Sequence, residues 1–238
     1  MTHRALRARK NIEQTDPASA TERTPAPYSR DMKTLLQINS SVFGEEGNSS
    51  QLTQAFAQAW LRVHPGWQAI RRDLAECIRA HLDGPAERAL RYGLDSQLDS
   101  AQFEALRLSD TLIAELDGAD VLLFGIPMYN YGIPSQLKTY FDYIARARVT
   151  FRFTELGPVG ILKDRPVYVM ATRGGFYGGA DGPDLQTPHV TAFLEMIGLK
   201  DVHFVYAEGL NISAELRDRA MAQARARIDE LVRAGEAV

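Results

Sequence analysis

The sequence predicts an α/β fold in which a five-stranded parallel sheet lies between two layers of helices. Short apolar segments alternate along the chain with longer segments whose apolar residues recur every three or four positions. Two short segments, residues 121–126 and 166–172, are apolar almost throughout, as strands buried on both faces should be. A hydrophobic content of 45% supplies enough apolar surface for a large core.

The first strand is expected at residues 34–39 (TLLQIN), which are mostly apolar and end in a polar turn. Ser49 and Ser50 provide two candidate N-caps for the helix that follows. The apolar face of this helix consists of Leu52, Phe56, Ala59, Trp60 and Val63. The sequence His-Pro-Gly at 64–66 ends it. Residues 67–74 form a second strand, and three consecutive charged residues predict that it lies at an edge of the sheet.

The middle of the chain alternates less regularly. Residues 76–99 show no dominant period. Residues 101–116 form the next expected helix, whose apolar face consists of Phe103, Leu106, Ile113 and Leu116. Residues 121–126 (VLLFGI) are the third strand. Pro134 then begins a helix at a position where its missing N–H costs nothing, and the apolar stripe of that helix consists of Leu137, Tyr140, Phe141 and Ile144.

The last third of the chain returns to a regular pattern. Residues 149–163 are expected to form an extended excursion with turns, and residues 166–172 (PVYVMAT) form the fourth strand. The next helix ends at Gly198, and its apolar positions are Val190, Phe193, Leu194 and Ile197. Residues 202–207 are the last strand. The final helix has its apolar positions at Leu216, Ala220, Ala224, Ile228 and Leu231.

Five strands that alternate with helices favour a three-layer sandwich of the flavodoxin-like type, with strand order 2-1-3-4-5. In such open sheets, ligands bind beyond the carboxyl ends of the strands, near the point where the strand order reverses. That point lies between strands 1 and 3 of the expected order. The loops that leave strands 1, 3 and 4 are therefore the place to look for functional residues.

Residues 1–31 differ from the rest of the chain. They hold few large apolar residues and several prolines. Their six basic and four acidic side chains give this segment a net charge of +2 and leave a net charge of −5 for the remainder of the chain. Such a segment cannot bury enough apolar surface to offset the entropy of ordering it, so we expect a disordered extension. It has no apolar segment typical of a secretory signal. A true tail and a start codon assigned too early both stay open, and the folded unit is expected at 32–238.

Composition argues against several functional classes. A net charge of −3 argues against nucleic-acid binding. Cys77 is the single cysteine, so neither an intrachain disulfide nor a cysteine-based metal cluster is expected. No apolar run approaches the roughly 18 residues that span a bilayer. No histidines are spaced as a metal pair, and His189 is expected to cap a helix or lie on the surface. We therefore expect a cytoplasmic protein without a metal site or a membrane partner.

The first polar loop covers residues 39–50 (NSSVFGEEGNSS) and enters a helix N-terminus. Free backbone N–H groups at such a terminus, with hydroxyl donors beside them, suit a phosphate. The candidate donors are Ser41, Asn48 and Ser49, with Ser50 as a further candidate, and Gly47 allows the backbone to approach a ligand closely. A Ser-capped helix after a polar turn is the alternative interpretation. The loop matches neither the P-loop nor the dinucleotide-binding motif.

The second polar loop covers residues 127–133 (PMYNYGI). Tyr129 and Tyr131 are able to cover a flat ring, Asn130 donates and accepts hydrogen bonds, and Met128 is a soft packing partner. A heteroaromatic cofactor requires this combination of apolar faces and a polar edge. The alternative is that the two tyrosines pack under the following helix.

The third polar loop covers residues 172–179 (TRGGFYGG) and begins at Thr172. Arg173 is followed by Gly174 and Gly175, which permit a tight turn and expose backbone N–H groups. Such donors suit the carbonyl edge of a flavin and would stabilise negative charge on it. A glycine-rich surface turn is the alternative.

Residues 127–142 (PMYNYGIPSQLKTYFD) resemble the signature of the FMN-dependent NADH-azoreductase family, also described as NADH:quinone oxidoreductases. The resemblance continues through residues 148–153 (RVTFRF), 171–175 (ATRGG), 193–198 (FLEMIG) and 207–209 (AEG). It covers nearly the whole chain beyond the N-terminal extension.

The resemblance implies a flavodoxin-like homodimer with one FMN per subunit and an active site near the subunit interface. It places the FMN phosphate at Ser41, Gly47, Asn48 and Ser49. It places the flavin ring at Met128, Tyr129, Asn130, Tyr131, Thr172, Arg173, Gly174 and Gly175. Two departures stand out. Tyr131 replaces the more usual Phe and adds a hydroxyl, and Glu45 with Glu46 makes the phosphate loop unusually acidic, which bears on FMN affinity.

The reaction that the resemblance implies has two stages in a ping-pong order. NADH donates a hydride to the flavin and leaves, and a quinone or an azo compound then accepts two electrons, which for azo compounds leads to cleavage of the azo bond. No catalytic side chain is expected, because water can supply the protons. A flavodoxin-type electron carrier acting on protein partners is the alternative, although carriers lack a segment such as residues 149–163. A serine hydrolase is disfavoured because the chain has no G-x-S-x-G elbow.

Overall fold

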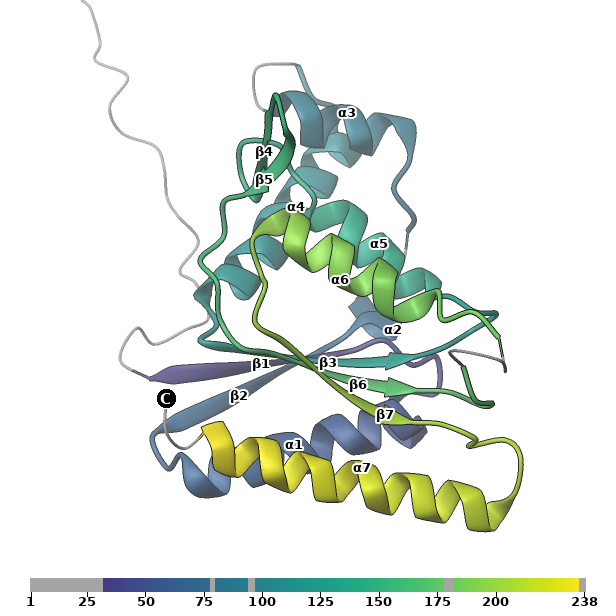
Figure 1. Ribbon diagram of the computed structural model, residues 1–238. Helices are drawn as coiled ribbons and strands as arrows, with labels where there is room; N and C mark the ends of the chain where they lie inside the picture. Colours follow the sequence, from purple (N-terminus) through teal and green to yellow (C-terminus); the bar gives the residue numbers. More distant parts are fainter. Residues whose placement is uncertain (1–31, 78–79, 94–96, 178–181, 236–238) are drawn as a thin grey trace, which may run out of the picture.

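The computed structural model describes residues 32–77, 80–93, 97–177 and 182–235, so the expectation for residues 1–31 lies outside the described residues. Five parallel strands form the main sheet in the order β2-β1-β3-β6-β7 (Figure 1). The strands are β1 (Lys33–Asn39), β2 (Trp67–Asp73), β3 (Val121–Pro127), β6 (Val167–Thr172) and β7 (Val202–Ala207). Counted within this sheet, the order is 2-1-3-4-5, which confirms the predicted topology and places β2 at an edge.

Helices cover both faces of the sheet. They are α1 (Asn48–Val63), α2 (Leu74–Cys77), α3 (Gly84–Tyr92), α4 (Ser100–Gly118), α5 (Ser135–Ile144), α6 (Gln186–Ile197) and α7 (Ala214–Gly235). Figure 1 shows α1 and α7 on one face and the remaining helices on the other. Within the described residues, no helix is both long enough and apolar enough to cross a membrane.

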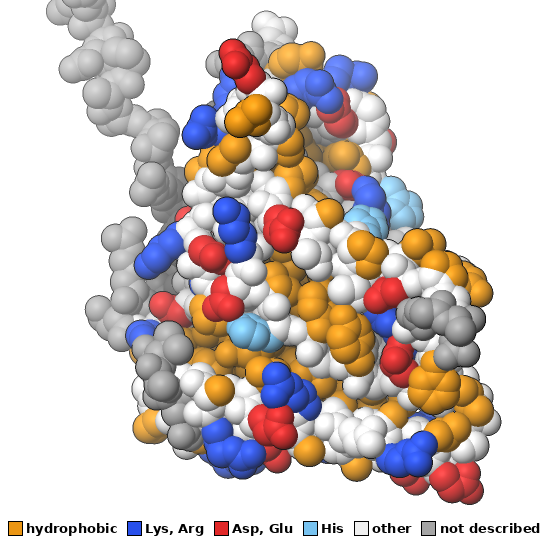
Figure 2. All heavy atoms as spheres, in the orientation of Figure 1, with side chains coloured by type: hydrophobic (Ala, Val, Ile, Leu, Met, Phe, Trp, Pro, Cys, Tyr) orange, Lys and Arg blue, Asp and Glu red, His pale blue; other side chains and the backbone are white. Residues whose placement is uncertain are grey.

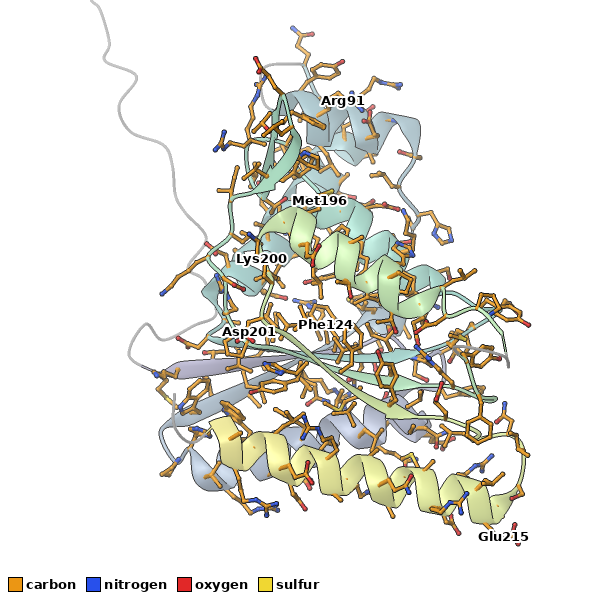
Figure 3. All side chains as sticks on the ribbon, in the orientation of Figure 1. Arg91, Phe124, Met196, Lys200, Asp201 and Glu215 are labelled. Carbon is orange, nitrogen blue, oxygen red and sulfur yellow. The ribbon has the colours of Figure 1, made fainter. Side chains whose placement is uncertain are left out.

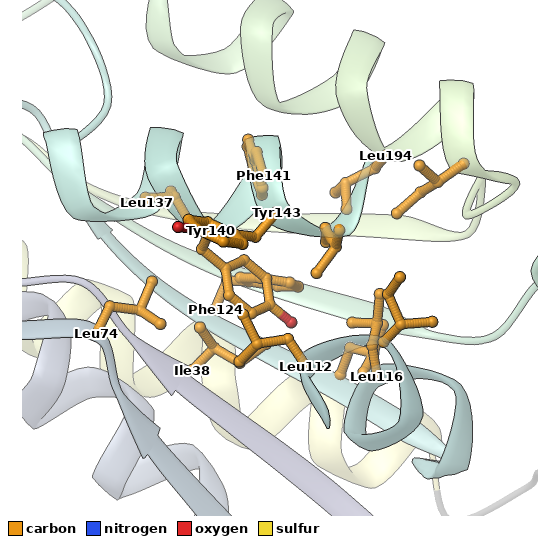
Figure 4. Packing of buried hydrophobic residues seen from close by; sticks show 14 of the residues in the cluster. Ile38, Leu74, Leu112, Leu116, Phe124, Leu137, Tyr140, Phe141, Tyr143 and Leu194 are labelled. Carbon is orange, nitrogen blue, oxygen red and sulfur yellow. The ribbon is translucent and has the colours of Figure 1, made fainter. Parts of the chain in front are cut away.

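Two hydrophobic cores result from this layering because successive residues of a strand face opposite sides. On the side of α4, α5 and α6, Ile38 and Phe124 belong to one cluster with Tyr140 and Phe141 (Figure 4). Phe141 also stacks on Phe193, with 3.9 Å between the ring centroids.

The opposite core joins the sheet to α1 and α7. Leu35 and Leu123 contribute to it from the strands, and Phe56 and Trp60 contribute to it from α1. The end of α7 packs so closely that a Cβ at Gly235 would lie 2.7 Å from a ring carbon of Trp60. The two cores fix the twisted sheet between its two helix layers, so the carboxyl ends of the strands keep a fixed arrangement.

Two segments have more structure than the sequence predicted. The excursion at residues 149–163 contains the antiparallel hairpin of β4 (Phe151–Thr154) and β5 (Gly157–Gly160), which lies outside the main sheet. The segment without a clear period contains α2 and α3. Asp83 caps α3 by accepting a hydrogen bond from the backbone N–H of Ala86 at 2.8 Å. That helix buries two alanines and one leucine, which gives too weak an apolar pattern to detect.

Candidate functional site

The three polar loops meet at the carboxyl ends of β1, β3 and β6, which are neighbours in the sheet. The hydroxyl of Tyr129 lies 3.5 Å from Ser41 Oγ and accepts a hydrogen bond from the backbone N–H of Val42 at 3.3 Å. The rings of Tyr131 and Tyr177 meet edge to face at 5.5 Å. The first loop therefore contacts the second, and the second contacts the third, as the sequence predicted.

The backbone of the first loop is folded tightly around Ser41. The Ser41 hydroxyl accepts a hydrogen bond from the N–H of Phe43 at 3.2 Å. A Cβ placed on Gly47 would lie only 2.2 Å from Ser41 Oγ. Position 47 therefore requires glycine, because any side chain would push the two halves of the loop apart.

The N-terminus of α1 follows directly and has spare hydrogen-bond donors. The helix begins at Asn48 with Gly47 as its N-cap, so the prediction that Ser49 and Ser50 cap it is wrong. Both serines lie in the first turn instead, and their buried hydroxyl groups have no hydrogen-bond partner among the described residues. No side chain caps the first N–H groups of the helix. Buried donors without a partner, at the positive end of a helix dipole, suit a phosphate.

The acidic residue Glu45 of the first loop lines a surface cavity together with Ser50. Glu45 forms an ion pair with Arg71 of β2, and both side chains are substantially exposed. The hydrogen bond from Arg71 to Glu45 raises the pKa of the arginine further above its ordinary value. Glu46 is exposed, and its carbonyl accepts a hydrogen bond from Gln51. The ion pair with Arg71 therefore offsets the charge of Glu45 beside the donors of α1.

The second loop is a tight turn with an unusual backbone. Tyr129 and Gly132 exchange two backbone hydrogen bonds of 3.0 Å. The two residues between them, Asn130 and Tyr131, have φ angles of 50° and 67°, in the left-handed region. Asparagine tolerates this region well, whereas tyrosine rarely enters it, so the turn stores strain at Tyr131. The strained turn holds both side chains at the rim of the site, where they are exposed.

The third loop has a buried ion-pair cluster at its base. The guanidinium of Arg173 donates hydrogen bonds to Asp184, Gln186, Thr187 and Glu208. Burial alone would raise the pKa of Asp184, but hydrogen bonds from Thr187 and Arg173 outweigh it and lower that pKa. Asp184, Gln186 and Glu208 were not predicted as site residues. Each lies 11 to 35 positions from Arg173 in the sequence, and no local motif connects them.

A cavity of about 700 Å³ opens between the first two loops and α5. Phe43 and Asn130 line it, together with Gln136 and Lys138 of α5 and His189 of α6. The sequence interpretation placed His189 at a helix cap or on the surface, but it faces this cavity. Burial lowers the pKa of His189, and nearby Lys138 lowers it further. Figure 2 shows hydrophobic side chains along the right edge of the molecule, where the strands end.

Sequence comparison assigns the chain to a family. Residues 32–232 match a family described as having a flavodoxin-like fold. A protein from Cellvibrio japonicus named FMN-dependent NADH:quinone oxidoreductase is 47% identical over 203 residues, which are 85% of this chain and 100% of that protein. The chain belongs to this family.

Solved structures agree with that assignment at the level of the fold. A crystal structure of an azoreductase from Bacillus anthracis superposes with a TM-score of 0.77 at 24% identity, covering 84% of this chain and 99% of the other. The azoreductase AzrA superposes with a TM-score of 0.75 at 25% identity, covering 84% and 98%. The flavodoxin-like fold predicted from the sequence is thereby confirmed.

Proposed function

We propose that this protein is an FMN-dependent oxidoreductase that transfers electrons from NADH to quinones and to azo compounds. One structural observation carries the proposal: at the carboxyl ends of the strands, the buried hydroxyls of Ser49 and Ser50 and the N–H groups of the third-loop glycines have no hydrogen-bond partner among the described residues. The family relative named above supports the choice of FMN, NADH and quinones. The azoreductase neighbours support the choice of azo compounds.

The predicted site residues divide between the two ends of the cofactor. We propose that the phosphate side consists of Ser41, Gly47, Asn48 and Ser49, together with Ser50, whose buried hydroxyl has no partner among the described residues. We propose that the ring side consists of Met128, Tyr129, Asn130, Tyr131, Thr172, Gly174 and Gly175, with the buried side chain of Arg173 behind them. The chemistry that a bound FMN supplies is acceptance of a hydride from NADH and delivery of two electrons to the acceptor.

The side chains of this protein bind and orient the cofactor and do not take part in the reaction themselves. The uncapped start of α1 and its two free hydroxyls neutralise a phosphate locally, which matters because the folded part carries a net charge of −5. The strained turn at Asn130 and Tyr131 presents an amide and an aromatic ring at the rim. The two substrates use the same open face in turn, so the ping-pong order follows.

We also propose that the protein is a cytoplasmic homodimer. Phe153 of the hairpin is 74% exposed, and Leu156 at its tip is fully exposed. The top of the molecule in Figure 2, where the hairpin lies in Figure 1, shows hydrophobic atoms. Apolar side chains on a projecting hairpin favour a partner subunit. A single cysteine suits a reducing compartment.

The electron carrier was the alternative to an enzyme. The relative from Cellvibrio japonicus, which this chain matches over its full length, is named an oxidoreductase. That name favours an enzyme over an electron carrier. The hairpin between β3 and β6 is also the segment that carriers were expected to lack.

A flavin titration with an anaerobic reduction tests the function. The purified protein should bind FMN, and NADH should bleach the absorbance of the bound flavin, which a quinone then restores. A protein unable to bind FMN contradicts the flavoenzyme, and a flavin that NADH fails to bleach favours the carrier. Asn130→Ala should slow flavin reduction or weaken FMN retention. Asn130→Gly is the matched variant, because it removes the amide while keeping the left-handed backbone unstrained.

A further inference from the structure

We propose that Arg173 is a positioning residue: its buried guanidinium, shared among four side chains, holds the N–H groups of Gly174 and Gly175 toward the second loop, where they would donate to the carbonyl edge of a bound flavin. The inference rests on the proposed function. It differs from the sequence interpretation, in which Arg173 contacts the cofactor itself.

The guanidinium has little capacity left for a ligand. Its Nε donates to Gln186 Oε1 at 3.0 Å and its Nη1 donates to Glu208 Oε1 at 3.0 Å. Its Nη2 donates to Asp184 Oδ2 and Thr187 Oγ1, both at 2.8 Å. Only 2% of the side chain is exposed. Four of the five N–H donors of Arg173 are therefore used within the protein.

The partners of Arg173 connect the third loop to β3 and to the segment that follows β7. Gln186 also donates to the carbonyl of Ile126, near the end of β3, at 3.0 Å. Glu208 follows β7 and also accepts a hydrogen bond from the backbone N–H of Tyr177 at 3.2 Å. One cation thus fixes the third loop against the strands on either side of β6.

The backbone then determines where the free N–H groups point. The carbonyls of Arg173 and Gly174 accept hydrogen bonds from the N–H groups of Leu210 and Asn211, in the segment that follows β7. In a trans peptide the N–H points opposite to the C=O. The N–H groups of Gly174 and Gly175 therefore point away from that segment. Because β6 lies between β7 and β3, this is the side of the second loop.

Both N–H groups have no hydrogen-bond acceptor within the part of the chain that the structure describes. A Cβ on Gly174 would lie 2.5 Å from Nδ2 of the exposed Asn211, so a larger residue at position 174 requires that side chain to move. The pair is able to donate two hydrogen bonds to neighbouring carbonyl oxygens and to stabilise negative charge on them.

Stability alone does not account for the buried arginine. Removing a guanidinium and two carboxylates from water carries a large desolvation penalty, and apolar replacements of such clusters are often neutral or stabilising. Lysine would not substitute, because a compact ammonium cannot bridge partners that lie in a fork around the planar group. The cluster is explained if its role is to set the orientation of the donor loop.

The test compares two arginines of similar burial at opposite ends of β6. Arg173→Lys is measured beside Arg165→Lys, whose side chain is 9% exposed and pairs with Asp117 far from the site. The apoprotein is titrated with FMN by fluorescence quenching, the midpoint potential of the bound flavin is measured, and the melting temperature of each apoprotein is recorded. Glu208→Gln serves as a second variant that removes one charge and keeps the shape.

Arg173→Lys should weaken FMN binding about tenfold, as expected for the loss of one or two charge-assisted hydrogen bonds. It should also lower the midpoint potential, by about 30 mV if reduced FMN loses tenfold more affinity than oxidised FMN. Glu208→Gln should weaken FMN binding about threefold and also lower the midpoint potential, because it weakens one of the hydrogen bonds to Arg173. Arg165→Lys should lower the melting temperature and leave both flavin quantities unchanged.

Wild-type affinity and potential in both Arg173→Lys and Glu208→Gln would overturn the positioning role while leaving the proposed function intact. Equal losses in Arg165→Lys and Arg173→Lys would reduce the cluster to a structural role. A wild-type protein that binds no FMN would overturn both the function and this inference.

Discussion

The two ends of the main sheet use arginine in opposite ways. Arg165 precedes β6 and donates to the carbonyls of Leu116, Asp117 and Ala119, at the end of α4. These carbonyls have no partner within the helix, and a cation there also complements the helix dipole. Arg173 follows β6 and donates to side chains from two separate segments. Arg165 therefore caps the end of one helix, whereas Arg173 holds several loop segments together.

The same contrast extends to the hydrogen bonding of the two ends. At the amino end, Asp164 Oδ1 accepts hydrogen bonds from the backbone N–H groups of Arg165, Lys200 and Asp201, and these bonds lower its pKa. Figure 3 places Lys200 and Asp201 at the start of β7, opposite the site. At the carboxyl end, the hydroxyls of Ser49 and Ser50 have no partner among the described residues. These carboxylate contacts at the amino end stabilise the fold, whereas the two serine hydroxyls at the carboxyl end are available to a ligand.

Gly47→Ala should have the largest effect at the carboxyl end. The added methyl group would lie 2.2 Å from Ser41 Oγ, so the first loop must open. Overpacking costs about 1–3 kcal/mol, so FMN affinity should fall roughly 10- to 100-fold in a fluorescence titration. Gly66→Ala is the matched control, because no atom lies within 4 Å of its added Cβ. Equal FMN affinity in the two variants would show that the first loop does not bind the phosphate.

Arg165→Ala should have the largest effect at the amino end. It leaves carbonyls at the end of α4 without a partner, so the free energy of unfolding in urea should fall by about 2–3 kcal/mol. The affinity for FMN, measured well below the unfolding transition, should not change. If Arg165→Ala weakened FMN binding by more than its loss of stability explains, the two ends of the sheet would not have separate roles.

Ser49→Ala and Ser50→Ala should separate binding from stability. Each removes a buried donor that has no described partner, so the apoprotein should be as stable as wild type or slightly more stable. FMN affinity should fall about tenfold for each hydroxyl that reaches the phosphate. Ser109→Ala is the control, because the Ser109 hydroxyl already has a partner: it donates to the carbonyl of Tyr143 at 2.6 Å. That variant should lose about 1 kcal/mol of stability and keep its FMN affinity.

The smallest expected effect concerns pH and His189. Because its pKa is lowered in the folded protein, the unfolded chain binds this proton more readily. The histidine therefore has no effect well above its ordinary value of 6.5 and destabilises the fold progressively as the pH falls below it. His189→Asn should flatten the stability profile between pH 7 and pH 5, measured by thermal unfolding. A profile unchanged by this substitution would place the acid sensitivity elsewhere.

Much of the fold was predictable because apolar patterning is a local property. The five strands and the helices α1, α4, α5, α6 and α7 each have an apolar segment or stripe within their own sequence. The short helix α3 and the β4–β5 hairpin escaped prediction because packing against neighbours, rather than a local stripe, stabilises them. Leu162 after the hairpin, for instance, donates its N–H to the carbonyl of Ile197 at 3.2 Å.

The candidate site was predictable where its residues lie in one loop. Tyr129, Asn130 and Gly174 belong to short segments with a recognisable composition. Asp184 and Glu208 become neighbours of Arg173 only after β6 and β7 have paired, and no spacing rule reveals that. The sequence offers Ser49 and Ser50 both as phosphate donors and as helix caps, because sequence alone does not distinguish the N-cap from the first turn.

The packing of α7 on α1 has a consequence for synthesis of the chain. The apolar face of α1, with Phe56 and Trp60, shares its core with Met221, Ile228 and Leu231 of α7. Figure 1 shows the two helices together beneath the sheet. About 150 residues separate them, so α1 leaves the ribosome many seconds before its cover at rates of 5–20 residues per second. During that interval the nascent chain exposes an aromatic surface that chaperones bind and that favours aggregation.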